Sequence, residues 1–444
     1  MNLSIIGLGK LGACTAACFA NKGFNVIGVD VNEDFVNSIN SGKAPVFEPS
    51  LQNMIDNATN RLMATLDFEY ALLNSDITFL IVPTPSNQDG EFSDRYLKDA
   101  LQQLATAFKK KDSYHIFVIT STVSPGTTEK SLIPLIKSVS KKKLNKDFGI
   151  CYNPEFIALG SVVRDFLNPD MVLIGESDAK AGNSLEEIYN AACDNKPYIA
   201  RMSLISAEIT KISLNVYLTM KISFANTLAN ICEKIPGADV DAISRALGSD
   251  KRISPHFLKG GLSYGGPCFP RDGRAFVAFA QQHKINAELA RATNRVNLFQ
   301  INHLAEVVLD NVNNDDYVAV VGLAYKPNTP VIEESAAITL IQNLLAKKLR
   351  VIVYDSLAIS NVKARFGQAL IYASSLRECI ASSNVCVITN SDSEFRAIDE
   401  SYMTANTKVI IDCWRILDPA KLGQKVKYIC LGKANVHVKQ TLPS

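Results

Sequence analysis

The chain has 444 residues, too many for a single hydrophobic core, so we expect two or three domains. Apolar residues make up 47% of the chain and charged residues 20%, a composition that excludes extended disorder. The net charge of +2 gives no electrostatic basis for binding nucleic acid or an anionic membrane surface.

The apolar N-terminus, residues 1–30, does not have the pattern of a secretory signal. It lacks a basic start, and Lys10 and several glycines interrupt its apolar runs. No later segment approaches about eighteen consecutive apolar residues, so no membrane span is expected. The ten cysteines form no C-x-x-C pair, and the five histidines form no cluster with metal-ligand spacing. We therefore expect a cytoplasmic protein with mostly reduced thiols and no metal.

Residues 3–30 follow the order of a dinucleotide-binding unit: strand, glycine turn, helix, strand and acid. Gly7, Gly9 and Gly12 fit G-x-G-x-x-G, in which glycines allow a tight turn, approach to a pyrophosphate and close helix packing. Asp30 ends the second apolar run, where it could accept hydrogen bonds from ribose hydroxyls and favour NAD over NADP. A glycine turn without a ligand is the alternative.

Apolar runs that alternate with helix-like segments continue at 77–82, 115–120 and 171–174. This alternation predicts a mostly parallel, doubly wound sheet. Residues 203–235 contain no glycine or proline and have apolar residues at helical spacing, which predicts a long connecting helix. Helical segments are expected to continue to about residue 310.

The opening pattern returns in the last third of the chain. The run 318–321 meets Gly322, the run 350–355 ends in Asp355, and further apolar runs follow at 384–389 and 408–412. We expect an α/β fold of two Rossmann-like, doubly wound domains joined by a long central helix and a helical segment. The polar stretch 311–316 is a plausible boundary, and the expected domains are 1–202, 203–312 and 313–444.

A cysteine in the segment SYGGPCFPRD (263–272) is the first candidate for chemistry. Glycines admit unusual backbone angles and prolines stiffen the chain, so the loop holds Cys268 in a defined place. We interpret the glycines as room for a ligand to approach. A packed, inert thiol is the alternative, because cysteine is among the residue types most often buried.

Other polar candidates lie beside apolar segments. Lys211 and Asn215 are four residues apart and share one face of the predicted long helix, although a solvated face is the usual position of both. Glu155 and the hydroxyls of 121–128 follow strand-like runs, where doubly wound sheets place their ligands. Serine and threonine are also ordinary turn and cap residues, so a structural role stays open.

Together these stretches resemble the UDP-glucose dehydrogenase family of nucleotide-sugar dehydrogenases. The matching segments occur in the family's order from residue 5 to about 329: GLGKLG, PTPSNQDG, STVSPGTT, NPEF, AEITKISLN, GADV, SDKRIS, FLKGGLSYGGPCFPRD and GLAYKPNT. GGPCFPRD closely follows the family's GGxCFxKD active-site pattern. The resemblance implies NAD binding by 1–202, dimerisation and active-site residues in 203–312, and UDP-sugar binding by 313–444.

The resemblance also implies the reaction, in which a primary alcohol is oxidised twice to a carboxylate with two NAD molecules. A thiolate adds to the intermediate aldehyde, the thiohemiacetal is oxidised to a thioester, and hydrolysis releases the acid. By resemblance, Cys268 is the nucleophile, and Lys211 and Asn215 stabilise negative charge on the substrate oxygen. Asp272 is implied to orient the catalytic water or the lysine. Thr122 and Glu155 are implied to hold that water, with Glu155 as candidate general base.

Binding residues are carried over in the same way. The implied cofactor-binding residues are Gly7, Gly9, Lys10, Leu11, Gly12, Asp30, Pro83, Thr84 and Thr122. The implied substrate-binding residues are Glu155, Phe156, Ile157, Lys211, Asn215, Arg252, Phe257, Leu258, Lys259, Tyr264, Gly265 and Lys326. Arg252 is expected to reach in from the neighbouring subunit of an obligate homodimer.

Three positions depart from the family's pattern. Leu159 stands in NPEFIALG where the family commonly has a second glutamate. Glu333 stands where an arginine normally meets the cofactor pyrophosphate, and Trp414 where a substrate-contacting arginine is expected, with Arg415 adjacent. These departures leave the sugar and the details of cofactor binding open.

UDP-glucose is the first expected substrate, because Asp89 and Gly90 follow PTPSNQ as in glucose-type relatives. The nearest alternative is the same chemistry on a UDP-N-acetylhexosamine. A non-catalytic sensor of nucleotide sugar or NAD and a single-step alcohol dehydrogenase are the alternatives from other classes.

Overall fold

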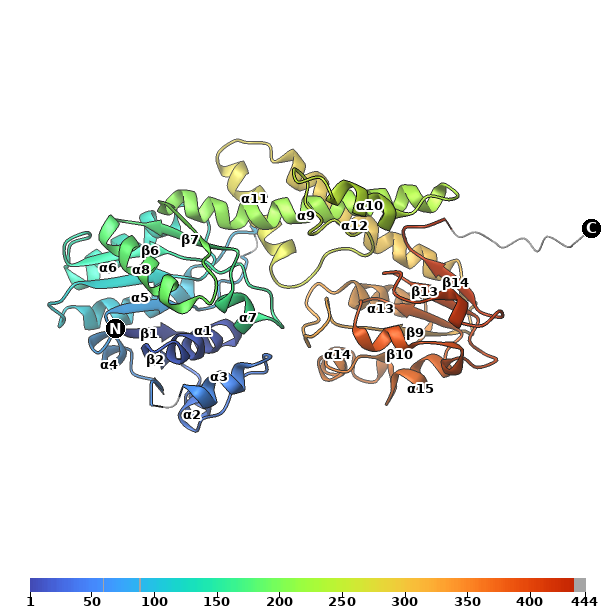
Figure 1. The fold of residues 1–444 in the computed structure, drawn as a ribbon, viewed down its shortest axis with the longest axis horizontal. Helices are drawn as coiled ribbons and strands as arrows, with labels where there is room; N and C mark the ends of the chain where they lie inside the picture. Colours follow the sequence, from blue (N-terminus) through green and yellow to red (C-terminus); the bar gives the residue numbers. More distant parts are fainter. Residues whose placement is uncertain (59, 88, 435–444) are drawn as a thin grey trace, which may run out of the picture. The chain divides into compact units, whose positions relative to one another are not determined.

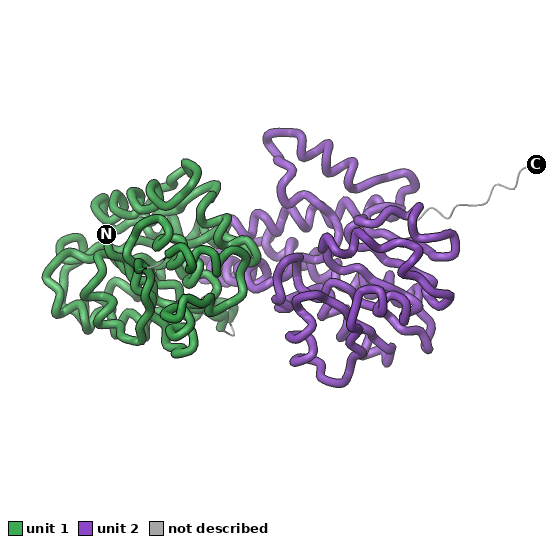
Figure 2. The backbone as a smooth tube through the Cα atoms, turned by 60° about the horizontal axis from the view of Figure 1, so that its bottom comes forward, with its two compact units in different colours: residues 1–213 green, residues 214–444 purple. Residues whose placement is uncertain are grey.

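The computed structural model describes residues 1–434 except 59 and 88, so one position of the segment PTPSNQDG and the last ten residues of the expected third domain lie outside the described part. The backbone divides into two compact units, residues 1–213 and 214–444, coloured separately in Figure 2. Each unit is built on one sheet (Figure 1).

Unit 1 has an eight-stranded sheet in the order β3-β2-β1-β4-β5-β6-β7-β8. Its neighbouring strands are parallel except for the pair β6 and β7. The strands are β1 (Asn2–Ile6), β2 (Asn25–Val29), β3 (Leu62–Thr65), β4 (Ile77–Leu80), β5 (His115–Ile119), β6 (Phe148–Tyr152), β7 (Met171–Glu176) and β8 (Tyr198–Ser203). The helices are α1 (Lys10–Asn21), α2 (Glu33–Asn40), α3 (Leu51–Asn57), α4 (Phe68–Leu73), α5 (Arg95–Phe108), α6 (Ile133–Ser140), α7 (Val162–Leu167) and α8 (Ala179–Ala192), with a π-helical turn at Thr128–Leu132.

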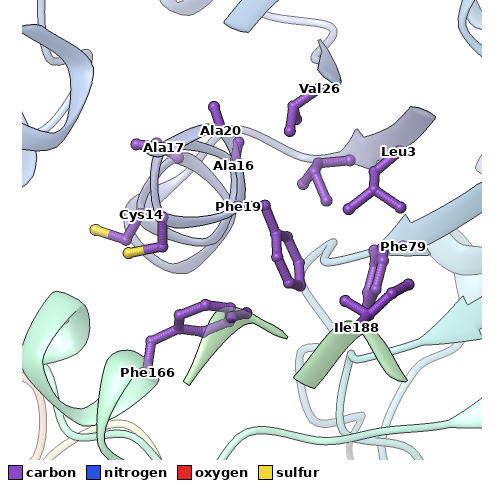
Figure 3. Packing of buried hydrophobic residues seen from close by; sticks show 14 of the residues in the cluster. Leu3, Cys14, Ala16, Ala17, Phe19, Ala20, Val26, Phe79, Phe166 and Ile188 are labelled. Atoms are coloured by element: carbon purple, nitrogen blue, oxygen red, sulfur yellow. The ribbon is translucent and has the colours of Figure 1, made fainter. Parts of the chain in front are cut away.

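The central strands β4 and β5 of unit 1 are mostly apolar and buried along their whole length, as expected for a parallel sheet that helices cover on both faces. One face packs against α1, whose small Ala and Cys side chains let the helix lie close to the strands. Phe19 of this helix contacts Phe79 of β4 and Phe166 of α7, with ring centroids 5.2 and 5.1 Å apart (Figure 3). The glycine turn before α1 is therefore fixed by the core beneath it.

Helix α9 (Leu204–Lys234) confirms the long helix predicted over 203–235. It begins in unit 1 and continues into unit 2 along one uninterrupted backbone. The absence of glycine and proline from this segment explains its length, since neither helix breaker interrupts it.

Unit 2 has an all-parallel sheet in the order β11-β10-β9-β12-β13-β14. The strands are β9 (Tyr317–Val321), β10 (Arg350–Tyr354), β11 (Ile371–Tyr372), β12 (Val385–Ile388), β13 (Val409–Asp412) and β14 (Lys427–Cys430). The helices are α10 (Val240–Gly248), α11 (Phe269–Gln282), α12 (Glu288–Leu309), α13 (Ala336–Ala346), α14 (Ile359–Phe366) and α15 (Leu376–Ala381), with short 3-10 turns after α14 and β12 and before β14. The fold class predicted from the sequence, two Rossmann-like sheets and a central helix, is confirmed.

The second sheet repeats a detail of the first. Gly322 follows β9 with φ +87°, and Asp355 at the end of β10 accepts hydrogen bonds from the amides of Leu323 and Ala324. In unit 1, Asp30 at the end of β2 likewise accepts from the amide of Leu8. Both turns are thus held by an acid on the neighbouring strand. Across the described ranges of the chain, no helix is long and apolar enough to cross a membrane.

Candidate active site

The three glycines of the first turn have different physical reasons to be glycine. Gly7 has φ +98°, and a Cβ there would lie 2.4 Å from the carbonyl oxygen of Ile81. A Cβ on Gly12 would lie 1.8 Å from the carbonyl oxygen of Gly7. A Cβ on Gly9 would meet no atom within 4 Å. Packing therefore requires the first and third glycines, whereas the second leaves open space over the start of α1.

This open space fits a dinucleotide pyrophosphate. Gly9 is the N-cap of α1, and no side chain caps the helix there. The amides and partial positive charge of a helix N-terminus favour a phosphate group. The turn also lies between β1 and β4, where the strand order of the sheet reverses and doubly wound folds bind their ligands.

Asp30 holds the glycine turn onto β2. Its Oδ2 accepts from the amide of Leu8 at 2.6 Å, and its Oδ1 accepts from the amide of Asn32 at 2.9 Å. A carboxylate offers about four acceptor positions, so these bonds leave capacity for ribose hydroxyls. The sequence predicted only ribose binding by Asp30 and not these hydrogen bonds to the backbone of the turn.

The remaining cofactor candidates lie around the same turn. Lys10 and Leu11 begin α1 and are partly buried, and Pro83 and Thr84 follow the carboxyl end of β4. Thr84 is buried. Their contacts with the cofactor stay predictions.

Glu155 follows β6 and is partly buried. Removal from water raises its pKa to about 7, although a hydrogen bond from Tyr189 and the charge of Lys211 act in the opposite direction. The Tyr189 hydroxyl lies 3.1 Å from Oε1 of Glu155 and 2.6 Å from Oδ1 of Asn153. The sequence analysis did not predict a role for Tyr189, because this residue of α8 belongs to no recognisable motif.

Lys211 is buried and directed to the same segment. Its ammonium group donates a 2.6 Å hydrogen bond to the carbonyl oxygen of Glu155 and lies 4.6 Å from the centre of the Phe156 ring. The structure therefore brings together two predicted catalytic residues of unit 1, and the solvated-face alternative for this lysine is wrong. Ile157 follows, partly buried.

A second buried acid of α9 fixes the hydroxyl-rich loop 121–128. Glu208, fully buried, accepts from the amides of Gly126 and Thr128. Desolvation raises the pKa of Glu208. Thr122 is partly buried in this loop. The only sequence signal for Glu208 is a charged residue inside the apolar helix, three positions before Lys211.

Cys268 lies at the N-cap of α11 and is exposed. All ten cysteines fall within the described residues, and the other nine are buried or partly buried. The packed-thiol alternative for Cys268 is therefore wrong. The partial positive charge of the helix N-terminus favours a thiolate at this position.

Asp272 lies one turn further along α11, where its amide donates to the carbonyl oxygen of Cys268 at 2.8 Å. Its side chain is fully buried, and its oxygens accept from Nδ2 of Asn215 at 2.6 Å and from Nε of Arg271 at 3.1 Å. Asn215 is itself buried, so its solvated-face alternative is also wrong. In unit 2 the structure thus pairs the predicted asparagine and aspartate directly.

The predicted substrate residues of unit 2 are placed differently from one another. Arg252, Phe257 and Lys259 are exposed, whereas Leu258 and Tyr264 are buried and Lys326 is partly buried. The Tyr264 hydroxyl donates to Oδ1 of Asn294 at 2.9 Å. Their contacts with substrate stay predictions.

The glycine pair of the cysteine loop also has a structural reason to be glycine, and its interpretation as room for a ligand stays a prediction. A Cβ on Gly265 would lie 2.1 Å from the carbonyl oxygen of Glu334, and one on Gly266 would lie 2.5 Å from the ring of Tyr325. The amide of Gly266 also donates to the carbonyl oxygen of Glu333. The glycines therefore make room for the loop after β9.

The three residues that depart from the family pattern, Leu159, Glu333 and Trp414, differ in burial and contacts. Leu159 is partly buried against the apolar core of unit 1. Glu333 is exposed and contributes its backbone to the cysteine loop. The indole Nε1 of Trp414 donates to the carbonyl oxygen of Thr389 at 3.0 Å. No cluster of metal-ligating side chains occurs within the residues that the structure covers.

A glycine turn with an acid on the next strand, and a thiol exposed at a helix N-terminus, define a dinucleotide-binding protein with an accessible cysteine. Comparison with known proteins specifies it further. Models of the three domains of the UDP-glucose/GDP-mannose dehydrogenase family match the chain: the NAD binding domain over 1–193, the central domain over 205–298 and the UDP binding domain over 319–419. The chain belongs to this family and is an NAD-dependent nucleotide-sugar dehydrogenase.

Individual relatives cover nearly the whole chain. The UDP-glucose 6-dehydrogenase AglM of Haloferax volcanii is 38% identical over 421 residues, which are 94% of this chain and 97% of the relative. The GDP-mannose 6-dehydrogenase of Pseudomonas aeruginosa is 32% identical over 93% of this chain and 96% of its own. The solved UDP-glucose dehydrogenase of Pyrobaculum islandicum aligns with a TM-score of 0.89 at 30% identity, covering 98% of each chain.

Proposed function

We propose that the chain oxidises the C6 alcohol of UDP-glucose to the carboxylate of UDP-glucuronate with two molecules of NAD. The 38% identity to AglM, a UDP-glucose 6-dehydrogenase, supports glucose as the sugar. Asp89 and Gly90 after PTPSNQ agree with that choice. The match to the UDP binding domain supports uridine diphosphate as the carrier.

In the first oxidation the C6 hydroxyl loses a proton and C6 loses a hydride, which leaves an aldehyde. Bound NAD supplies the two-electron acceptor for this transfer and for the second one. Lys211 and Asn215, one turn apart on α9, are proposed to stabilise the negative charge that develops on the oxygen. A well-placed donor of this kind contributes about 3 kcal/mol to transition-state stabilisation.

Cys268 is proposed to trap the aldehyde. Its thiolate sulfur bonds to C6, the aldehyde oxygen takes up a proton, and a thiohemiacetal forms. Loss of a second hydride from C6, together with the hydroxyl proton, converts it to a thioester. The covalent bond keeps the carbon in the site between the two oxidations.

Hydrolysis completes the reaction. Glu155 is proposed to accept a proton from water as the water oxygen bonds to C6, and the C–S bond then breaks to regenerate the thiolate. A carboxyl with a pKa of about 7 is a suitable base near neutral pH. One water and one alcohol thus become one carboxylate, with four electrons leaving as two hydrides.

One observation carries the proposal: Cys268 is exposed at the start of α11, one turn before a buried aspartate that Asn215 holds. The test measures NADH and acid formed from UDP-glucose by the purified protein. Two NADH per UDP-glucuronate support the proposal. One NADH with an aldehyde product indicates a single-step dehydrogenase, and no NADH with any nucleotide sugar indicates a sensor.

The sugar is tested separately with UDP-glucose, UDP-N-acetylhexosamines and GDP-mannose at equal concentrations. The highest kcat/KM with UDP-glucose is the expected result. NADH formation with only the N-acetylated sugars selects the alternative substrate class. Activity confined to GDP-mannose contradicts both substrate assignments.

We also propose a homodimer in which Arg252 serves the neighbouring site. Tyr217, Phe224 and Ile231 of α9 are 57%, 53% and 49% exposed and recur every seven residues, so they form one apolar stripe on the helix. Such a stripe on a helix supports association with another apolar surface. The Arg252 side chain is 88% exposed and pairs with Asp250, two residues before it in sequence, at 2.6 Å.

A further inference from the structure

Arg415 is an arginine whose nitrogens are committed to the protein itself. Its Nε and Nη2 donate to the two carboxylate oxygens of Asp241 at 2.8 and 2.9 Å. Nη1 donates to the carbonyl oxygen of Leu431 at 2.6 Å, and Nη2 also donates to that of Gly260 at 2.7 Å. The side chain is only 4% exposed. Arg415 therefore does not act as the substrate-contacting arginine that the family pattern places next to it.

The backbone at Arg415 is also specialised. Its φ is +56°, in the left-handed region that non-glycine residues rarely adopt and that costs about 1 kcal/mol. The carboxylate of Asp412, at the end of β13, accepts from the amides of Trp414 and Leu417 on either side. The turn that directs the guanidinium inward is thus held in place by the strand before it.

Trp414, the residue before Arg415, contacts the same loop segment, residues 259–261. A Cβ on Gly261 would lie 2.8 Å from the Trp414 ring, and the ammonium group of Lys259 lies 5.8 Å from the ring centre. The indole Nε1 is fixed by the carbonyl oxygen of Thr389 at the end of β12. Arg415 therefore supports Gly260 by hydrogen bonding while Trp414 packs on Gly261, and Lys259 directly precedes both glycines.

We propose that Trp414 and Arg415 are positioning residues that hold the Lys259 ammonium group in place for the diphosphate of the nucleotide-sugar substrate. The inference rests on the proposed function, because it assigns residues to the site that binds that substrate. It also explains how the chain functions with a tryptophan in place of the expected arginine. Lys259, already implied as a substrate-binding residue, makes the contact with substrate, and the aromatic ring and the buried guanidinium fix the loop that carries it.

The electrostatics of the site agree with this assignment. The Lys259 side chain is exposed, yet the protein atoms around its ammonium group lower its pKa by partial loss of water, and Arg415 and Arg396 lower it further by repulsion. Asp241 and Asp412 act in the opposite direction. Arg415 and Arg396 thus both repel the Lys259 ammonium group, and a bound diphosphate would relieve this repulsion.

Trp414 is the single tryptophan of the chain, so its fluorescence reports directly on this site. Titration of the purified protein with UDP, checked by calorimetry, is expected to give a saturable change in emission with the calorimetric Kd. UDP that binds by calorimetry without changing the emission overturns the positioning proposal and leaves the proposed function standing. The absence of UDP binding overturns both.

The substitution Arg415→Lys keeps the positive charge and removes the planar guanidinium. We expect KM for UDP-glucose and Kd for UDP to rise about tenfold, while kcat changes less than about threefold and KM for NAD stays the same. Arg377→Lys is the matched control, since Arg377 is an exposed arginine of unit 2 that bonds to Ser401. Equal KM values in the two variants, or a loss confined to kcat, overturn the proposal.

A second variant keeps the test decisive where Arg415→Lys fails to fold. Asp241→Asn weakens the acceptor of the same guanidinium from α10 and leaves Trp414 and Arg415 intact. The same pattern is expected: a higher KM for UDP-glucose, an unchanged KM for NAD and a weaker response of the tryptophan emission to UDP. An unchanged KM for UDP-glucose in a folded Asp241→Asn variant contradicts the proposal.

Discussion

The hydroxyl of Tyr189 lies 3.1 Å from Oε1 of Glu155, a carboxyl group whose pKa is raised to about 7 by removal from water. The tyrosine acts against that rise, because its hydrogen bond stabilises the ionised carboxylate. The same hydroxyl is also 2.6 Å from Asn153. One residue of α8 thus adjusts the protonation of the proposed base without touching the reacting carbon.

Tyr189→Phe is therefore expected to move the acid limb of the pH profile upward. Wild-type kcat should rise with pH through about 7 as Glu155 ionises, and the variant should need a higher pH for the same fraction of activity. Tyr198→Phe is the control, since Tyr198 is 72% exposed in the same unit. Superimposable profiles for wild type and both variants contradict the role of Glu155 as base.

The same carboxyl makes stability depend on pH. The unfolded chain releases this proton near 4.5 and the folded chain near 7, so the folded state binds more protons between these values. The contribution of Glu155 to stability is complete below about pH 4.5 and is lost as pH rises to about 7. Glu155→Gln should flatten this part of the curve. Urea unfolding of wild type and Glu155→Gln from pH 5 to pH 8 measures the difference. If the free energy of unfolding changes with pH equally in both proteins, Glu155 does not have the proposed pKa.

Cys268→Ser is expected to lower acid formation by at least about a thousandfold, because a serine hydroxyl does not replace the thiolate as a nucleophile here. Binding of NAD, measured by calorimetry, should remain at the wild-type level. Cys430→Ser serves as control, since burial raises the pKa of Cys430 to about 11 and keeps that thiol protonated. Acid formation by Cys268→Ser at the wild-type rate ends the covalent proposal.

The glycines of the cofactor turn should separate stability from binding. Gly12→Ala places a methyl group 1.8 Å from the carbonyl oxygen of Gly7 and should lower the melting temperature clearly, by a loss of about 2 kcal/mol or more. Gly9→Ala meets no protein atom within 4 Å, so the melting temperature without cofactor should stay unchanged. The added methyl group instead occupies the space proposed for the pyrophosphate, and Kd for NAD should rise. An equal Kd in wild type and Gly9→Ala contradicts that placement.

Subunit mixing tests the proposed role of Arg252. Arg252→Ala and Cys268→Ser should each be inactive alone, whereas heterodimers contain one site with both native residues. When the two variants are mixed in equal amounts and exchange subunits, half of the dimers are heterodimers with one intact site of two. About a quarter of wild-type activity should therefore return. Phe224→Asp, in the middle of the apolar stripe, should shift the molecule to the monomer in analytical ultracentrifugation. No recovery in a mixture shown to contain heterodimers argues that Arg252 serves its own subunit.

Much of the architecture could be predicted because it is encoded locally. The glycine turn, its strands and helix α9 depend on residues close together in sequence, and each lies within a residue or two of its predicted bounds. Tyr189 and Glu155 are 34 residues apart, and their pairing depends on how α8 returns to β6. The pair Arg415 and Asp241 spans 174 residues. Such contacts leave no local pattern, and for the same reason the packing of Gly265 and Gly266 against the loop after β9 could not be predicted.

The exposure of a single thiol determines where oxidants and alkylating agents modify the protein. Cys268 is open to solvent, while the remaining cysteines are buried or partly buried. Peroxides and alkylating electrophiles attack accessible thiolates first, so damage of this kind is expected to concentrate on Cys268 and, through its proposed role as nucleophile, to lower activity before the fold is harmed. A bound nucleotide sugar should shield that sulfur. If Cys268 is the proposed nucleophile, the rate of the proposed oxidation depends on the concentration of oxidants around the protein and on how often substrate occupies the site.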